Sequence, residues 1–249
     1  MSSLPLTGER TLPGIAEENY WFRRHEAAYL ALAPLVEVGR LVEVGAGEGY
    51  GTALLAERAE FSCAIDYDPA AIGHLAGRYA GLNPVRANLA ALPVGTDQVD
   101  IVVSLQVIEH VWDHRQFLDE CARVLRPGGS LLLSTPNRLT FSPDARAGDR
   151  PANPFHTHEF TAAELLALVG SAGFTDLRLR GLHPSDRLIA LDERYRASGG
   201  FVAAQLAGPA ASWPVELAAE VASVTAADFA VSDAAPDASL DLIVLARSA

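Results

Sequence analysis

The 249-residue sequence contains only two cysteines, Cys63 and Cys121. Two cysteines are too few for a disulfide framework or for a metal site made of thiolates. One falls in an expected strand and the other on the apolar stripe of an expected helix. We therefore expect both thiols to be buried and chemically inert.

The sequence also lacks long apolar runs and an excess of basic residues. No apolar stretch approaches the roughly 20 residues that span a bilayer, and the first ten residues lack the basic start and apolar stretch of a signal peptide. These absences predict a cytoplasmic protein without membrane insertion. With 19 Lys and Arg against 31 Asp and Glu, the net charge is −12. Such a surface repels phosphate backbones, which excludes nucleic acid as the expected partner.

Apolar, β-branched segments alternate with helical patterns through the middle of the chain. The run 100–105 is hydrophobic almost throughout, which is typical of a strand covered on both faces in a parallel sheet. Asp113 is placed to cap one helix, and Thr161 with Glu164 forms a capping box for another. This alternation predicts an α/β fold with a doubly wound, mostly parallel sheet that binds its ligand at the carboxyl ends of the strands. The seven expected strands are 40–44, 61–66, 85–88, 99–105, 130–135, 177–182 and 240–246.

Three stretches interrupt the alternation, namely residues 1–39, the loop 138–160 and the segment 183–236. We expect a single domain over 1–249, with an N-terminal helical cap in 1–39 and a cofactor-binding core in 40–182. The insertion 183–236 then precedes the last strand, in 237–249. Because insertions of this length are more often functional covers than idle loops, we expect a substrate lid in 183–236, with a packing appendage as the alternative.

A glycine-rich turn, residues 45–49, follows the first expected strand. Glycines let the backbone approach a ligand closely, but Tyr50 takes the place of the third glycine of a dinucleotide-binding turn. Glu43 and Glu48 flank the turn without any Lys or Arg, and carboxylates there repel a pyrophosphate but suit an ammonium and a sulfonium. Asp66 stands 21 residues beyond the start of the turn, where an acid accepts hydrogen bonds from ribose hydroxyls. A site for an adenosine with a cationic amino-acid tail is therefore predicted.

These features resemble the class I S-adenosylmethionine-dependent methyltransferases, over most of residues 40–180. The resemblance implies S-adenosylmethionine as the cofactor, with its methionine part in the glycine-rich turn and its ribose on Asp66. It implies that Tyr67 lies against the adenine, that Asn88 meets the adenine amino group and that Gln106 begins the segment beneath the sulfonium. The implied cofactor-binding residues are Glu43, Gly45, Ala46, Gly47, Gly49, Asp66, Tyr67, Asn88, Leu89, Gln106 and Arg10.

Two N-terminal motifs, Thr-Gly-Glu-Arg at 7–10 and Glu-Asn-Tyr-Trp-Phe-Arg-Arg-His at 18–25, resemble a bacterial subgroup that acts on sugars and glycans. The whole chain is similar to actinobacterial methyltransferases linked to 6-O-methylglucose lipopolysaccharide assembly. The resemblance implies an O-methyltransferase for a hydroxyl of a sugar or (lipo)polysaccharide precursor, with 6-O-methylation of glucose units as the implied reaction. The expected partner is thus a small-molecule or oligosaccharide acceptor. A methyltransferase for another small molecule, such as a quinone or lipid, is the alternative.

A sugar hydroxyl is a poor acid and must lose its proton as it attacks a methyl group. A histidine, with a pKa near neutrality, is the natural base. His110, after the fourth expected strand, and His156, on the loop after the fifth, are the candidates, and Glu109 joins them as an expected catalytic residue. A packing role for His110 and an exposed position for His156 are the alternatives. Four other histidines share no motif with a candidate and are expected to be mostly solvated: His25, His74, His114 and His183.

The pattern Gln106-x-x-Glu109-His110, together with His156, resembles the metal-binding E-x-x-E-H plus distal histidine of quinone and small-RNA O-methyltransferases. That resemblance implies a divalent metal that acidifies the acceptor hydroxyl. Gln106 replaces the first carboxylate with a neutral amide, which weakens affinity for a hard cation. A metal-free histidine base is therefore the leading expectation, and a divalent metal is the alternative.

Overall fold

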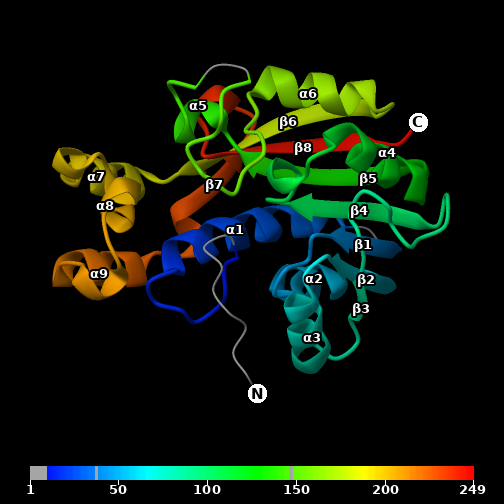
Figure 1. Ribbon diagram of the computed structural model, residues 1–249, viewed down its shortest axis with the longest axis horizontal. Coiled ribbons are helices and arrows are strands. Elements are labelled where there is room, and N and C mark those ends of the chain that lie inside the picture. Colours follow the sequence, from blue (N-terminus) through cyan, green and yellow to red (C-terminus); the bar gives the residue numbers. More distant parts are fainter. Residues whose placement is uncertain (1–9, 37–38, 146–147) are drawn as a thin grey trace.

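The computed structural model describes residues 10–36, 39–145 and 148–249, so residues 7–9 of the first N-terminal motif lie outside the described residues. Over these ranges the chain forms one sheet with helices on both faces (Figure 1). The strand order is β3-β2-β1-β4-β5-β8-β6-β7. The strands are β1 (Arg40–Val44), β2 (Phe61–Asp66), β3 (Asn83–Arg86), β4 (Val99–Leu105), β5 (Leu125–Pro136), β6 (Thr175–Pro184), β7 (Phe229–Ser232) and β8 (Asp241–Arg247).

The first five strands are parallel, and β8 joins β5 and β6 by antiparallel pairing. The predicted α/β class and the doubly wound, mostly parallel sheet are therefore confirmed. The expected number of seven strands is one too low for the described residues, because β7 lies inside the insertion 183–236. This four-residue strand pairs antiparallel with β6 at the edge of the sheet and is too short to produce a clear alternation in the sequence.

The two helices whose caps were predicted begin at the expected capping residues. The side chain of Asp113 accepts a hydrogen bond from the backbone N–H of Gln116, and the capping box of Thr161 and Glu164 is present. Within the described residues no helix is long and apolar enough to cross a bilayer. The α-helices are α1 (Asn19–Leu32), α2 (Tyr50–Ala56), α3 (Pro69–Arg78), α4 (His114–Val124), α5 (Arg138–Phe141), α6 (Ala162–Ser171), α7 (Asp186–Arg194), α8 (Phe201–Leu206) and α9 (Val215–Ser223).

Alternate residues of the central strands pack on opposite faces of the sheet. On one face Val102 and Leu131 contact the apolar side of α4 and α6, while on the other Ile101 and Leu132 contact α1 and α2. This double covering explains why β4 is hydrophobic at nearly every position. As expected, Cys63 and Cys121 are both buried, as free thiols.

The segment 183–236 adds a separate group of helices to one end of the sheet. In Figure 1, α7, α8 and α9 stand together beyond the end toward which β4 and β5 point. Their apolar side chains join the core cluster that also contains α1. The insertion is therefore packed against the N-terminal helix near the carboxyl ends of the parallel strands, where a ligand is expected.

Candidate active site

The glycine-rich turn between β1 and α2 packs closely against the segment that follows β4. Gly45 has a φ of +86°, and a Cβ at this position would lie 2.3 Å from Cγ2 of Val107. Gly49, with a φ of +97°, is the N-cap of α2. Residues with a side chain rarely adopt such φ values, so glycine at these positions lets the turn form without steric strain.

Asp66, the last residue of β2, is held against this turn by backbone donors. The N–H of Gly47 donates to Oδ2 at 2.7 Å, and the N–H of Asp68 donates to Oδ1 at 2.8 Å. Each carboxylate oxygen has further lone pairs with which it can accept hydrogen bonds. The carboxylate is thus fixed at the edge of the turn and remains able to accept ligand hydroxyls.

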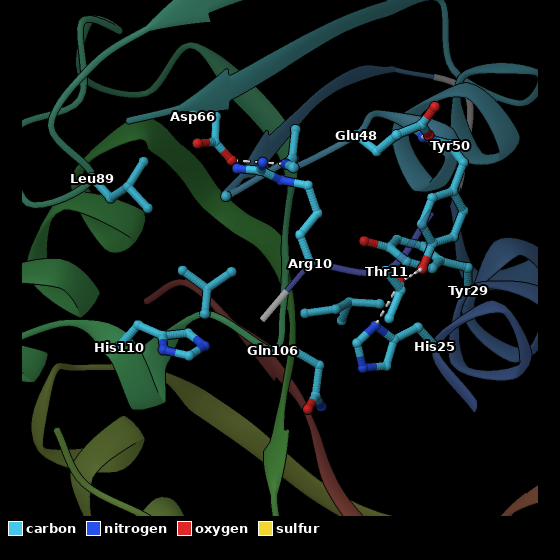
Figure 2. Close-up of a pocket in the computed structure, with 15 residues that line it drawn as sticks. Arg10, Thr11, His25, Tyr29, Glu48, Tyr50, Asp66, Leu89, Gln106 and His110 are labelled. Atoms are coloured by element: carbon cyan, nitrogen blue, oxygen red, sulfur yellow. Dashed lines mark hydrogen bonds between the residues drawn. The ribbon is translucent and has the colours of Figure 1, made fainter. Parts of the chain in front are cut away.

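A cavity of about 240 Å³, here called the turn cavity, lies beside the glycine-rich turn (Figure 2). Its lining combines the turn, the end of β2 and the segment after β4 with residues from the N-terminal segment and α1. The expected cofactor-binding residues that line it are Arg10, Gly45, Ala46, Gly47, Asp66, Leu89 and Gln106.

Four expected cofactor-binding residues do not line the turn cavity, and the structure gives the reason for each. Glu43 is buried behind the turn, where its carboxylate accepts hydrogen bonds from the hydroxyls of Tyr29 and Thr52. Gly49 faces α3 instead of the cavity. The side chain of Tyr67 is 66% exposed, and the Asn88 side chain accepts a hydrogen bond from the N–H of Ala90. These four residues therefore lie outside the lining of the turn cavity, and their contacts with the cofactor stay predictions.

The two carboxylates that flank the turn stabilise its surroundings. Burial raises the pKa of Glu43 to about 7, and the charge of Asp66 adds to this effect, whereas the hydrogen bonds from Thr52 and Tyr29 oppose it. Glu48 lines the turn cavity, but its carboxylate accepts a hydrogen bond from the hydroxyl of Tyr79 and lies 2.9 Å from Nε2 of His74. His74, expected to be solvated, is therefore part of this framework.

A second and larger cavity of about 500 Å³, here called the loop cavity, lies between α1, α8 and the loop 138–160. Aromatic side chains, carboxylates and imidazoles line it together, with the apolar side chains of Val202 and Leu206 from α8. The two cavities meet at a set of residues that line both, here called the junction: Arg10, Thr11, His25, Gln106 and His110.

Gln106 occupies the junction in a constrained conformation. Its φ of +58° is in the left-handed region, which is costly for a residue other than glycine and is found where the surroundings enforce it. The side-chain nitrogen donates to Oγ of Ser134 at 3.1 Å and to Oδ1 of Asp241 at 3.2 Å. Because both amide hydrogens have these partners, the side chain of Gln106 is fixed to the ends of β5 and β8.

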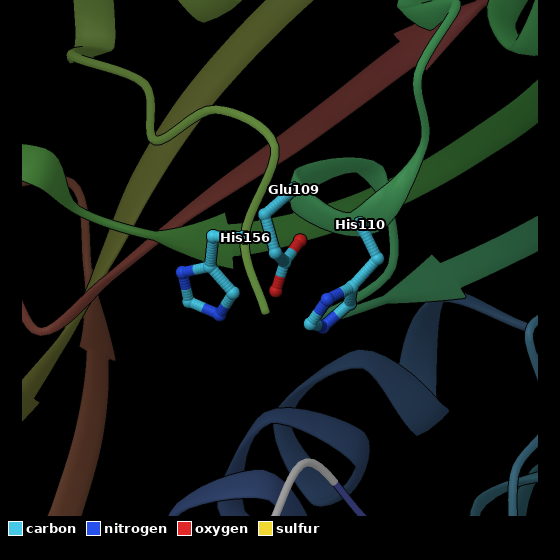
Figure 3. Close-up of side chains that lie close together, drawn as sticks. All are labelled: Glu109, His110 and His156. Carbon is cyan, nitrogen blue, oxygen red and sulfur yellow. The ribbon is translucent and has the colours of Figure 1, made fainter. Parts of the chain in front are cut away.

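Glu109, His110 and His156, here called the Glu-His-His cluster, lie together at the edge of the loop cavity (Figure 3). One donor atom from each residue lies within 4.8 Å of the other two. Thr157 brings the two segments together, since its N–H and hydroxyl donate to the carbonyl oxygen of Glu109 at 2.7 and 3.0 Å. The sequence-based grouping of these three residues thus corresponds to a compact cluster, which does not include the side chain of Gln106.

Acceptor groups orient both imidazoles of the cluster. Nδ1 of His156 lies 2.7 Å from Oε1 of the buried Glu159, and Nδ1 of His110 lies 3.2 Å from the carbonyl oxygen of Phe155. When each Nδ1 carries the proton, Nε2 is the basic nitrogen of each ring. Burial alone would raise the pKa of Glu159, but the hydrogen bond and charge of His156 bring it below the usual range. Glu159 is a positioning residue that the sequence analysis missed.

Glu109 is the buried carboxylate of the cluster, with only 1% of its surface exposed. Burial raises its pKa to about 7, while the nearby His156 and a 3.1 Å hydrogen bond from the hydroxyl of Thr135 act in the opposite direction. A carboxyl group in this state can exchange a proton near neutral pH.

His25 was expected to be mostly solvated and to share no motif with a candidate residue, but the structure places it, partly buried, in the lining of both cavities. His25 lies on α1 at the junction, with Nδ1 3.3 Å from the hydroxyl oxygen of Thr11, which is 3.4 Å from that of Tyr50. The spacing of Trp21, Arg24 and His25 puts all three on one face of a helix, and all three line the loop cavity. This spacing was the signal in the sequence that could have identified His25.

Comparison with known proteins gives a consistent picture. The family described as "Methyltransferase domain" matches residues 42–133. A protein of Mycobacterium tuberculosis described as a probable S-adenosylmethionine-dependent methyltransferase is 49% identical over 249 residues, which cover 98% of this chain and 89% of that protein. A protein of Mycolicibacterium smegmatis with the same description is 48% identical over 248 residues, which cover 98% and 95%. A crystal structure of an S-adenosylmethionine-dependent methyltransferase from Thermotoga maritima superposes with a TM-score of 0.64 at 18% sequence identity. The match covers 94% of this chain and 95% of that protein, and it shows a similarity of fold.

We predict that Asp66→Ala weakens the binding of S-adenosylhomocysteine by about 100-fold. Two hydrogen bonds from ribose hydroxyls to a carboxylate contribute about 3 kcal/mol together, which corresponds to this factor. Titration calorimetry measures the affinity, and Asp119→Ala serves as the matched control, since Asp119 of α4 has a side chain that is 42% exposed and lines neither cavity. An unchanged affinity of Asp66→Ala would remove the ribose assignment.

We also predict a pH-dependent effect of Glu43→Gln on stability. The folded-state pKa of Glu43, about 7, is above its unfolded value of about 4.5, so its contribution to stability is present at low pH and is lost as the pH rises through 7. Glutamine cannot ionise. The free energy of unfolding of Glu43→Gln relative to wild type should therefore increase by about 2–3 kcal/mol between pH 5 and pH 8.

Urea unfolding of the ligand-free proteins at the two pH values measures this difference. The exposed residue Glu57 provides the matched control, and Glu57→Gln should follow wild type at both pH values. Equal pH dependence of Glu43→Gln and wild type would contradict the raised pKa.

Proposed function

The chain belongs to the class I S-adenosylmethionine-dependent methyltransferases, and from this premise we propose that it methylates a hydroxyl of a sugar or (lipo)polysaccharide precursor, with position 6 of a glucose unit as the preferred target. The observation that carries the proposal concerns the segment 18–25, on which the resemblance to glycan-active enzymes rests. Four of its residues line the loop cavity: Glu18, Trp21, Arg24 and His25.

S-adenosylmethionine fits the residues around the turn cavity. Gly47 lines this cavity, and an added Cβ there would meet nothing within 4 Å, so its backbone is open to a ligand, while Asp66 offers a fixed carboxylate for the ribose. When bound, the cofactor supplies a methyl group on a positively charged sulfur. Gln106 and His110 then stand between this cavity and the acceptor, since both line the two cavities.

The loop cavity has the mixed lining that a sugar ring needs. A sugar presents apolar C–H faces and a rim of hydroxyl groups. The aromatic rings of Trp21, Phe141 and Phe155 can pack against the C–H faces of the sugar. The carboxylates of Glu18 and Glu159 can accept hydrogen bonds from its hydroxyl groups. A quinone or lipid would require a more apolar cavity, because burying ionisable groups against an apolar ligand is costly.

The junction and the Glu-His-His cluster provide the means to activate the hydroxyl. Methyl transfer is an in-line displacement, so a cavity that holds the acceptor oxygen opposite the sulfur supplies much of the rate. As the new C–O bond forms and the C–S bond breaks, the hydroxyl proton passes to an imidazole. His25, His110 and His156 are the imidazoles that line the loop cavity.

We assign a lid function to the segment 183–236. Val202 and Leu206 of α8 line the loop cavity, and Leu206 is 70% exposed. An apolar cover on this side would exclude water from the acceptor, which favours attack by the sugar over hydrolysis.

We expect the purified protein to transfer a labelled methyl group from S-adenosylmethionine to a glucoside or glucose-containing oligosaccharide. The assay uses a panel of glucosides, oligosaccharides and quinones, and NMR of the product maps the methylated position. Methylation of quinones alone would overturn the proposed acceptor class.

His110→Ala and His156→Ala are each expected to lower kcat by about 100-fold or more, because acid–base groups contribute factors of this size. Affinity for S-adenosylhomocysteine should stay near the wild-type value, which separates a catalytic defect from a binding defect. His158→Ala is the matched control, since His158 lies on the same loop but lines neither cavity. Full turnover by both cluster variants would show that this cluster is not the catalytic group.

A further inference from the structure

We propose that Glu109, His110 and His156 bind a divalent transition-metal cation of the zinc, manganese, iron or cobalt class. The proposal starts from the convergence of three donor atoms within 4.8 Å of one another. Metal–ligand bonds to nitrogen and oxygen are about 2.0–2.2 Å long, so two ligands of one ion lie about 3–4 Å apart. Small side-chain rotations would therefore bring all three atoms onto one ion.

The hydrogen bonds around the cluster are those expected of metal ligands. Histidine ligands usually donate their second ring N–H to a carboxylate or a backbone carbonyl, which fixes the lone pair on the other nitrogen. His156 has the carboxylate of Glu159 as this partner, and His110 has the carbonyl of Phe155. Glu109 is itself oriented by the hydroxyl of Thr135. Each ligand thus has a supporting contact in place.

The donor set also indicates the class of ion. Two imidazoles and one carboxylate suit zinc and the divalent first-row transition metals, whereas magnesium and calcium prefer sites made of oxygen. Three protein ligands leave coordination positions open, as in catalytic metal sites. Because all three residues also line the loop cavity, a metal held by them would be accessible from the space assigned to the acceptor.

One contact must change when the ion binds. The side-chain nitrogen of Asn153 lies 3.0 Å from Nε2 of His156, so it has to turn away as the metal takes this position. Asn153 belongs to the partly exposed turn 153–156. We expect this rearrangement to slow metal binding without preventing it.

A consequence for catalysis follows if the proposed function holds. A metal held by His110 and His156 would occupy the lone pairs that otherwise accept a proton. It would lower the pKa of an acceptor hydroxyl in the loop cavity, and His25 at the junction would be the imidazole left to take the hydroxyl proton. The hydroxyl oxygen forms the bond to the methyl carbon, and the electron pair of the broken C–S bond stays on sulfur.

Metal binding is tested on the full chain after removal of metals with EDTA, in the absence of cofactor and sugar. Cobalt(II) titration followed by visible absorption, and zinc titration by calorimetry, should each show one ion per chain. Glu109→Gln, His110→Ala and His156→Ala should each weaken binding by more than about 100-fold, and Glu159→Gln by about 10–100-fold. His158→Ala and His25→Ala are the matched controls and should bind cobalt like wild type.

Two results would overturn this metal site. They are the absence of stoichiometric binding in wild type, and equal affinity in the cluster variants and wild type. Full methyl transfer by the metal-free protein would overturn the catalytic consequence instead. Circular dichroism checks that each variant is folded, and His110→Gln and His156→Gln replace any alanine variant that is not. Stoichiometric cobalt binding without methylation of any sugar would instead support the metal site and contradict the proposed acceptor.

Discussion

The arrangement of both cavities depends on the buried ion pair between Arg24 and Asp241. The two side chains are 3% and 2% exposed, and the guanidinium also lies 4.5 Å from the ring of Phe141. The pair joins α1 to the first residue of β8, and Asp241 in addition accepts a hydrogen bond from Gln106. Removing one partner of such a pair leaves an uncompensated buried charge, at a cost of about 3–5 kcal/mol. The N-terminal helix, the last strand and the junction are therefore fixed relative to one another by one carboxylate.

A second constraint fixes the loop that carries His156. Asn137 and Phe160 form a bridge, so the loop 138–160 leaves the sheet and returns to it at one point. The side chain of Asn137 closes this point by donating to the carbonyls of Pro236, Asp237 and Ser239. Because both ends of the loop are held at this bridge, the hydrogen bonds from Thr157 to the carbonyl oxygen of Glu109 place His156 beside the turn that follows β4. Local backbone pairing thus converts a long loop into a defined wall of the loop cavity.

The sequence predicted those parts of the molecule whose structure depends on neighbouring residues in the chain. The hydrophobic run of β4 and the caps of α4 and α6 are examples, as is the glycine-rich turn, where positive φ requires glycine. Glu43 was assigned to the ligand because it is adjacent to that turn in sequence. Strand alternation puts its side chain on the face covered by α1 and α2, where it meets Tyr29 and Thr52.

The roles of His25 and Glu159 depend on contacts between distant parts of the chain. His25 reaches the junction only because α1 packs across the sheet, and Glu159 reaches His156 only because the loop is closed at its base. The spacing of Trp21, Arg24 and His25 indicates a shared helix face, but no local pattern indicates what that face or Glu159 meets, since each contact arises from long-range packing. This explains why the glycine-rich turn was predictable from the sequence, whereas the full set of imidazoles around the junction was not.

The buried carboxyl group of Glu43 also connects ligand charge with protonation. The nearby charge of Asp66 raises the pKa of Glu43, because like charges that lie close together repel. A sulfonium and an ammonium bound at the turn would favour the ionised form of Glu43, so binding of the cofactor would release a proton from it. Methyl transfer removes the sulfonium charge and thereby weakens the attraction between the product nucleoside and the protein. The same acidic surroundings that favour the charged cofactor thus favour release of its neutral-sulfur product.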